Sequence, residues 1–148
     1  MTRTFDSAGH LATITDWNNN TTKFGYGHDS QLLTTTYPNG TKVASTYDNA
    51  GQLSATALTG TAGATLAALG FTRDNSGQLA TQTPTGLPDG PQTFTYSDRE
   101  QLATVSTGAA TSQYSADVAN NPILVGGSQQ AFDAAGQLCW SSASVVAN

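Results

Sequence analysis

Short runs of alternating apolar and polar residues follow one another along the chain, separated by polar turns that contain glycine. Leu11-Ala12-Thr13-Ile14-Thr15 and Leu102-Ala103-Thr104-Val105-Ser106 are two such runs, and both suit an extended chain. Asn39-Gly40 and Asp89-Gly90 are dipeptides that strongly favour a tight hairpin turn. The pattern therefore predicts a succession of β-hairpins.

A repeat accompanies this pattern, with Gln-Leu following a polar turn at residues 31, 52, 78, 101 and 137, and His10-Leu11 as a further copy. Six residues before each Leu there is usually an aromatic residue, and Asp-x-x-Gly lies between them. The copies begin at residues 5, 26, 47, 73, 96, 116 and 132, and the copy at 116 is degenerate. A unit of about twenty residues suits one hairpin with its connection.

The motif has a direct physical interpretation. Asp starts the turn by accepting a backbone N–H two residues on, and Gly supplies the positive φ that closes it. The aromatic residue and the Leu end the two strands and can pack as a cross-strand pair. The motif residues are Phe5, Asp6, Gly9, Leu11, Tyr26, Leu32, Tyr47, Asp48, Gly51, Leu53, Asp74, Gly77, Leu79, Tyr96, Leu102, Phe132, Asp133, Gly136 and Leu138.

We expect an all-β fold of about seven hairpins in a curved antiparallel sheet, with essentially no helix. Residues 59–70 should form an elongated hairpin tip, with a short helix over Ala64–Leu69 as the alternative. Four motif glycines should have positive φ: Gly9, Gly51, Gly77 and Gly136. Six apolar residues should be mostly buried: Leu11, Trp17, Leu32, Leu53, Leu79 and Leu102.

Composition and charge exclude several classes of fold and of binding partner. Charged residues make up only 10% of the chain, the net charge is −5 and the pI is about 4.5. This argues against helical bundles, against nucleic acid and against an anionic membrane surface. No apolar stretch could span a membrane, and no signal peptide is visible at the start. Cys139 is the only cysteine, so an intrachain disulfide is excluded.

Candidate catalytic or metal-binding residues are scattered along the chain. We interpret His10 and His28-Asp29 as solvated turn residues, and the recurring Asp residues as turn formers that lack the calcium-loop pattern. Glu100 replaces a turn Gly, and Cys139 is expected to be at least partly buried in a strand. We expect the aromatic residues to form an apolar sheet face, although a sugar-binding face is the alternative. No enzymatic activity, cofactor or metal is predicted.

The motif resembles the YD repeat, also called the RHS repeat, whose pattern is Tyr-Asp-x-x-Gly-x-Leu. Phe5-Asp6-Ser7-Ala8-Gly9-His10-Leu11 and Tyr47-Asp48-Asn49-Ala50-Gly51-Gln52-Leu53 are two full copies, while Gly27 and Ser30 depart from the pattern in the copy that begins at Tyr26. The family includes bacterial RHS polymorphic toxins, the B–C component of insecticidal toxin complexes, and teneurins. Its repeats form a β-sheet shell that in the bacterial members encloses a carboxyl-terminal toxin.

The resemblance implies that residues 1–148 are one non-catalytic YD-repeat array, a fragment of a larger shell without a toxin domain of its own. Its implied partners are the rest of the shell and an enclosed toxin, and its implied location is secreted or at the cell surface. The alternative is a cell-surface adhesive module that binds carbohydrate or protein. We also expect the isolated chain to self-associate or stay partly unfolded, because neither end looks like a cap.

Overall fold

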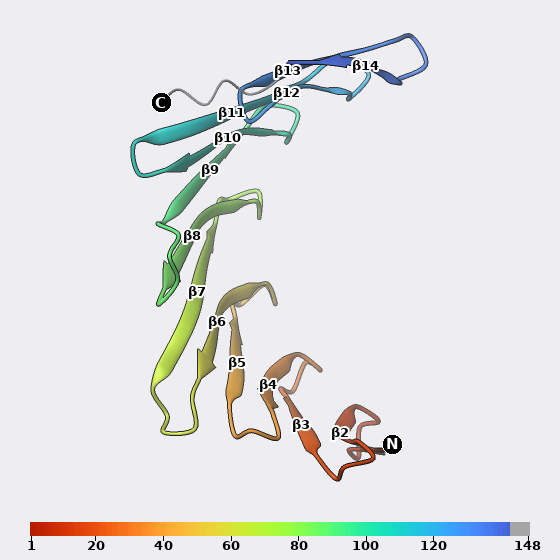
Figure 1. Ribbon diagram of the computed structural model, residues 1–148, viewed down its shortest axis with the longest axis vertical. Coiled ribbons are helices and arrows are strands. Elements are labelled where there is room, and N and C mark those ends of the chain that lie inside the picture. Colours follow the sequence, from red (N-terminus) through yellow and green to blue (C-terminus); the bar gives the residue numbers. More distant parts are fainter. Residues whose placement is uncertain (143–148) are drawn as a thin grey trace. The chain divides into compact units, whose positions relative to one another are not determined.

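The computed structural model describes residues 1–142 and contains β-strands joined by turns, with no helix among these residues. The strands alternate with turns along the whole described part of the chain (Figure 1). They are β1 (Thr2–Phe5), β2 (Leu11–Thr15), β3 (Thr21–Tyr26), β4 (Leu32–Thr36), β5 (Lys42–Tyr47), β6 (Leu53–Thr59), β7 (Thr65–Arg73), β8 (Leu79–Thr85), β9 (Gln92–Tyr96), β10 (Leu102–Thr107), β11 (Ala110–Ala116), β12 (Pro122–Val125), β13 (Ser128–Phe132) and β14 (Leu138–Ser141). Consequently, nothing in residues 1–142 is a helix long and apolar enough to cross a membrane.

Each strand pairs with the strands before and after it in the sequence, so the sheet order runs from β1 to β14 without a crossover. The prediction of an all-β array of antiparallel hairpins is confirmed. The chain divides into two compact units. The first unit comprises Met1–Thr72 and Thr83–Asp89, and the second comprises Arg73–Gln82 and the residues from Gly90 onward.

Seven turns, which we call motif turns, join each odd-numbered strand to the following even-numbered strand. They are Asp6–His10, Gly27–Gln31, Asp48–Gln52, Asp74–Gln78, Ser97–Gln101, Asp117–Asn121 and Asp133–Gln137. In each one the first residue donates its N–H to the fifth carbonyl at 2.8–3.0 Å, and the fourth N–H donates to the first carbonyl at 2.8–3.2 Å. The fourth residue always has a positive φ, between 61° and 84°. The motif turn is therefore a type I turn followed by a residue in the left-handed region, which is a common connection in twisted β-hairpins.

The glycines expected to have positive φ do have it: the values are 84° at Gly9, 77° at Gly51, 79° at Gly77 and 73° at Gly136. Cross-strand register also places the motif aromatic opposite the motif Leu, as in Phe5 with Leu11 and Tyr47 with Leu53. A register shift beside each of these pairs marks the bulge that the turn requires.

Connections at the other ends of the strands vary more. Asp16–Asn20, Tyr37–Thr41 and Gly60–Ala64 repeat the two hydrogen bonds of the motif turns. The Gly60–Ala64 turn joins β6 to β7, so residues 59–70 form a hairpin, as predicted, and its extra length lies in the strands rather than in a helix. The β8–β9 connection around Gly86 is irregular instead of forming a tight Pro-Asp-Gly turn.

The two faces of the sheet in the first unit differ in chemistry. Register aligns Phe24, Thr35, Val43, Leu58 and Ala67 in one row across β3 to β7. Because successive side chains alternate between faces, the neighbouring row of Thr34, Ala44, Ala57 and Ala68 lies on the other face. One face therefore carries larger apolar side chains, and the other carries threonine and alanine.

Burial is much lower than the sequence predicts. No hydrophobic side chain in residues 1–142 is buried, and Thr35 is the one buried polar residue there, at 8% exposure. Of the six residues expected to be mostly buried, Trp17 is 81% exposed and Leu32 is 37% exposed, and the other four are half-buried. The prediction is wrong for Trp17 because it lies in the Asp16–Asn20 turn rather than in a strand. It overstates the rest because a single sheet layer has no second layer to cover it.

Candidate functional site

The Asp residues that begin the motif turns organise those turns with their side chains. In all five such turns, which begin at Asp6, Asp48, Asp74, Asp117 and Asp133, Oδ1 accepts the N–H of the third and fifth residues at 2.8–2.9 Å. Asp16 does the same in a turn on the opposite side of the strands. These carboxylates thus satisfy backbone donors inside their own turns, and they are not gathered into one site.

Neighbouring motif turns are linked by the side chains of Tyr and Gln. The hydroxyl of Tyr47 donates to the carbonyl of Leu32 at 3.1 Å, and that of Tyr96 donates to the carbonyl of Leu79 at 3.0 Å. The amide of Gln78 donates to the carbonyl of Glu100 at 3.2 Å. These bonds join one pair of successive motif turns in the first unit and one pair in the second, so part of the motif closes a turn and part of it couples adjacent turns.

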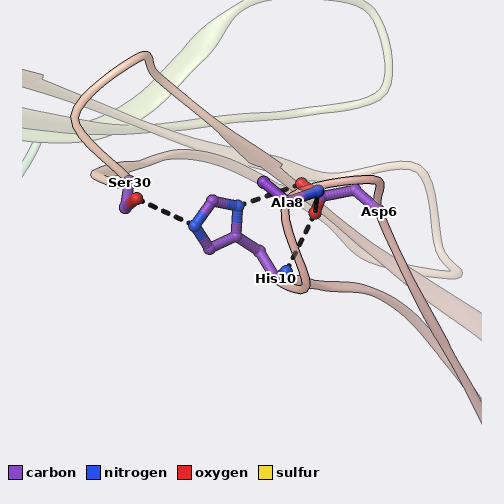
Figure 2. A network of polar contacts seen from close by, with 4 residues as sticks. All are labelled: Asp6, Ala8, His10 and Ser30. Carbon is purple, nitrogen blue, oxygen red and sulfur yellow. Dashed lines mark hydrogen bonds and ion pairs between the residues drawn. The ribbon is translucent and has the colours of Figure 1, made fainter.

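His10 lies in a polar cluster that joins two motif turns, and Figure 2 shows its ring lying between Asp6 and Ser30. His10 Nδ1 lies 3.1 Å from Asp6 Oδ2, and His10 Nε2 lies 2.8 Å from Ser30 Oγ. The ring also stacks on Tyr26, with centroids 4.7 Å apart. His10 is therefore not the solvated turn residue that the sequence predicts, because its side chain bridges two motif turns and is only 25% exposed.

Hydrogen bonds lower the pKa of three of these carboxyl groups. For Asp6 the main cause is the backbone N–H of His10, and for Asp16 and Asp117 it is the side-chain amide of Asn20 and Asn121. Each bond favours the ionised carboxylate, so the pKa of each group lies below its ordinary value of 3.8.

This lowering predicts a loss of stability in acid. The folded chain binds fewer protons than the unfolded chain at these three carboxyls, so their contribution is complete above an ordinary pKa of 3.8 and is lost as the pH falls through the folded values. In urea unfolding measured at a series of pH values from 7 to 2, the urea concentration at the midpoint should decrease once the pH is below about 4. Asp16→Asn keeps an oxygen acceptor but does not titrate, and it should flatten the decline; a midpoint that rises in acid would contradict the assignment.

Three residues other than glycine occupy the fourth position of a motif turn. Ser30 and Glu100 have φ of 61° and Asn120 has 71°. A side chain in this left-handed region costs energy, and asparagine tolerates it best.

Glu100→Gly is therefore expected to stabilise the second unit by about 1 kcal/mol, which corresponds to a rise of about 3 °C in Tm for a chain of this size. The hydrogen bond from Gln78 is retained, because it ends on the backbone carbonyl of Glu100. Thermal unfolding followed by circular dichroism measures the change. Asn120→Gly is the comparison and should gain less, since it removes the side-chain acceptor that Gln101 uses. A lower Tm for Glu100→Gly would show that its side chain has a stabilising role.

The remaining candidate residues stay apart. His28 and Asp29 are exposed, and no group of three or more His, Cys, Asp or Glu side chains in residues 1–142 is arranged to hold a metal ion. Cys139 lies in a strand, β14, as predicted, but it is exposed rather than partly buried. The reason is that β14 pairs with β13 and no other described segment covers it.

Sequence reasoning missed the contacts between turns. It identified Gln and Tyr as motif residues but assigned the aromatic ring to packing and gave Gln no role. The signal for this role was the recurrence of Gln before Leu. The turn itself accepts any polar residue at that position, so a repeated Gln indicates a contact outside the turn. It also missed Asp16-Trp17-Asn18-Asn19-Asn20 as a turn of the same type, in which Asn replaces Gly at the fourth position.

Comparison with known proteins agrees with the repeat. The Teneurin YD-shell family model matches residues 1–61. The comparison with curated proteins gives no match. Among solved structures, TcdB2-TccC3 without its hypervariable C-terminal region is similar over 91% of this chain, with a TM-score of 0.72 and 18% identity. The Tc holotoxin pore of Photorhabdus luminescens is similar over 94% of it, with a TM-score of 0.60 and 15% identity.

The chain spans 8% and 9% of the length of these two solved chains, and identities this low show a shared fold alone. The motif and the uniform motif turns agree with the match of residues 1–61 to the YD-shell model. Together these observations show that the chain is similar to the YD-repeat, or RHS-repeat, family, with the family match itself confined to residues 1–61.

Proposed function

We propose that the chain is a wall segment of a larger YD-repeat shell that encloses a carboxyl-terminal toxin and helps to deliver it in competition between bacteria. The rest of the shell and the toxin are its partners, and the assembly is secreted or displayed at the cell surface. The observation that carries this proposal is the sheet without a buried core: within residues 1–142 every hydrophobic side chain keeps some exposure.

The lack of a buried core supports the need for a partner, because a single sheet layer leaves its apolar side chains to be covered by another layer. The solved structures with a similar fold are toxin-complex proteins, one of them a holotoxin pore, which fits a structural role in such an assembly.

Limited proteolysis of the complete gene product that contains this segment tests the proposal. A carboxyl-terminal cargo should resist trypsin in native buffer and become cleavable in urea, while an exposed tag added at the amino terminus is cut in both. A cargo cut as fast as the tag in native buffer, or a reading frame without further YD repeats or cargo, would contradict it.

Sedimentation of the isolated 148-residue chain tests the same proposal independently. Association is expected, because β1 pairs with β2 alone and β14 with β13 alone among the described strands, which leaves backbone donors and acceptors open. A monodisperse monomer with a sharp unfolding transition would show that the chain is a complete domain.

Exposed aromatic rings favour a second candidate function, carbohydrate binding at a surface. Trp17 is 81% exposed and Tyr37 is 42% exposed, and they lie in the β2–β3 and β4–β5 turns at the same ends of the strands. Rings of this kind can stack on sugar faces. A glycan array probed with the chain and with Trp17→Ala tests this function: binding lost in the variant supports it, and no binding by either protein excludes it for the glycans on the array.

A further inference from the structure

Three of the positions at which the chain departs from its own motif lie in two successive motif turns. His10 replaces the usual Gln, Gly27 replaces the usual Asp, and Ser30 replaces the usual Gly. The structure brings His10 and Ser30 into direct contact (Figure 2). Turn stability alone explains none of the three changes, because the motif residues suit the turn better. Departures from local rules that meet in space are typical of functional sites.

The contacts of the cluster set the tautomer that the neutral His10 ring adopts. The Asp6 carboxylate is ionised and can only accept, so His10 Nδ1, 3.1 Å from Asp6 Oδ2, carries the proton. Nε2 of the neutral ring is then an acceptor, and the Ser30 hydroxyl donates to it at 2.8 Å. The Asp6 carboxylate is itself held by two backbone N–H groups through Oδ1. An oriented carboxylate, an imidazole and a hydroxyl in this order form the arrangement that activates a serine nucleophile.

The setting of Ser30 agrees with this chemistry. Its φ is 61°, a strained value for a residue with a Cβ, and strain of this kind is concentrated at functional sites. The stacking of His10 on Tyr26 holds the ring in plane with little freedom to rotate.

Donors for a developing oxyanion follow from comparing the motif turns. In the turns that begin with Asp, the N–H groups of the third and fifth residues meet on one carboxylate oxygen at 2.8–2.9 Å. The Gly27–Gln31 turn has the same two backbone hydrogen bonds, but Gly27 has no side chain to supply that oxygen. The N–H groups of Asp29 and Gln31 are therefore left without that carboxylate acceptor, beside the side chain of Leu33, whose Cδ1 would lie 3.3 Å from a Cβ on Gly27. Paired backbone donors of this kind stabilise tetrahedral intermediates.

An open surface hollow of about 630 Å³ adjoins the same turn on the side of β5, where Asp29, Gln31, Leu33 and Tyr47 contribute to its lining. Ser30 and His10 do not line it, so a substrate would reach Ser30 from the edge of this hollow. Asp29 and Asp48 at its wall disfavour an anionic ligand.

We propose that Ser30 is a nucleophile for acyl transfer, activated by His10 and oriented through Asp6, and that it accepts the acyl group of a small ester without negative charge. Ser30 Oγ bonds to the carbonyl carbon while its proton moves to His10 Nε2, and the carbonyl oxygen, now an oxyanion, is stabilised by the two N–H groups. The bond to the leaving oxygen then breaks, and that oxygen takes the proton from His10. Water repeats the sequence and releases the acid, so that ester and water give acid and alcohol.

The test uses the full chain with p-nitrophenyl acetate and with a fluorophosphonate, which Ser30 Oγ attacks at phosphorus with loss of fluoride. Peptide mass spectrometry should find the phosphonyl adduct on Ser30, and not on Ser76, an exposed serine in another motif turn. Hydrolysis of p-nitrophenyl acetate should show an initial burst of nitrophenol equal to the amount of protein, because acylation of Ser30 releases nitrophenol before water releases acetate.

Four variants separate this chemistry from folding. His10→Gln, Gly27→Asp and Ser30→Gly each restore the motif residue. The turns should form at least as well in His10→Gln and Ser30→Gly, whereas Gly27→Asp requires a small shift of Leu33, whose Cδ1 would lie 3.3 Å from the new Cβ. Ser30→Gly should abolish labelling. His10→Gln should slow it by about 100-fold because it removes the general base, and Gly27→Asp should slow it by a similar factor because its carboxylate would accept the two N–H groups that stabilise the oxyanion. Asp6→Asn keeps the turn acceptor and should slow labelling by a similar factor, about 100-fold, because it favours the wrong tautomer.

Gly51→Ser is the matched control. It places a serine at the fourth position of the next motif turn, where it faces Gln31 rather than a histidine, and this new serine should not be labelled faster than Ser76. Circular dichroism confirms that each variant is folded. Labelling of Ser30 no faster than of Ser76, or a rate unchanged by His10→Gln, would overturn the proposal.

Discussion

Gly86→Ala is expected to destabilise the first unit by about 3 kcal/mol, the largest effect of any single methyl group that we anticipate in this chain. Two costs combine at this position. Gly86 has a φ of 68°, which side chains rarely adopt, and a Cβ built there would lie 2.4 Å from the carbonyl oxygen of Leu66. Because that oxygen belongs to the backbone of β7, it cannot move aside by a change of rotamer.

Gly63→Ala separates these two costs. Gly63 has a φ of 81°, but nothing lies within 4 Å of the Cβ that it would gain. Only the backbone cost remains, so the loss should be about 1 kcal/mol. Urea unfolding of both variants measures the difference. Equal losses would show that the loop around Gly86 adapts and that its close approach to β7 is not a constraint.

Asp48→Ala is expected to cost about 1–2 kcal/mol, comparable to the loss of a helix-capping side chain. The substitution removes the oxygen that accepts the N–H groups of Ala50 and Gln52 at 2.9 and 2.8 Å. The turn is exposed, so water can accept the two freed N–H groups and offset part of the lost stability.

Asp48→Asn serves as the control for this second substitution, because its side-chain oxygen can accept the same two N–H groups. It should stay within a few tenths of a kcal/mol of the parent chain, in keeping with surface changes that preserve contacts. If Asn proved as costly as Ala in urea unfolding, the negative charge rather than the acceptor geometry would be what stabilises the turn.

The sequence predicts the turns well because their determinants are local. Asp48 and Gly51 act within five residues, and Asp48 accepts its hydrogen bonds without help from other hairpins. Burial was predicted poorly for the opposite reason. The exposure of Trp17 and Cys139 depends on whether another layer covers the sheet, which no local pattern encodes.

The contact between His10 and Ser30 lies between these two cases. Both residues are conspicuous in the sequence as departures from the motif, yet twenty positions separate them. Their proximity follows from the stacking of successive motif turns at a common strand end, and this requires the register of β2, β3 and β4. Knowing that the motif forms turns is not sufficient; the spacing of neighbouring turns is also needed.

The bonds of Tyr47 and Tyr96 to backbone carbonyls of the preceding hairpin have a consequence for how such proteins change length. A carbonyl oxygen is present whatever side chain the residue carries, so a hairpin with the motif can follow almost any other hairpin of the same kind. At junctions of this kind, loss or duplication of one whole hairpin would leave the same donor and the same acceptor. An array can therefore gain or lose length there in single hairpin steps, without a compensating substitution in the neighbouring hairpin.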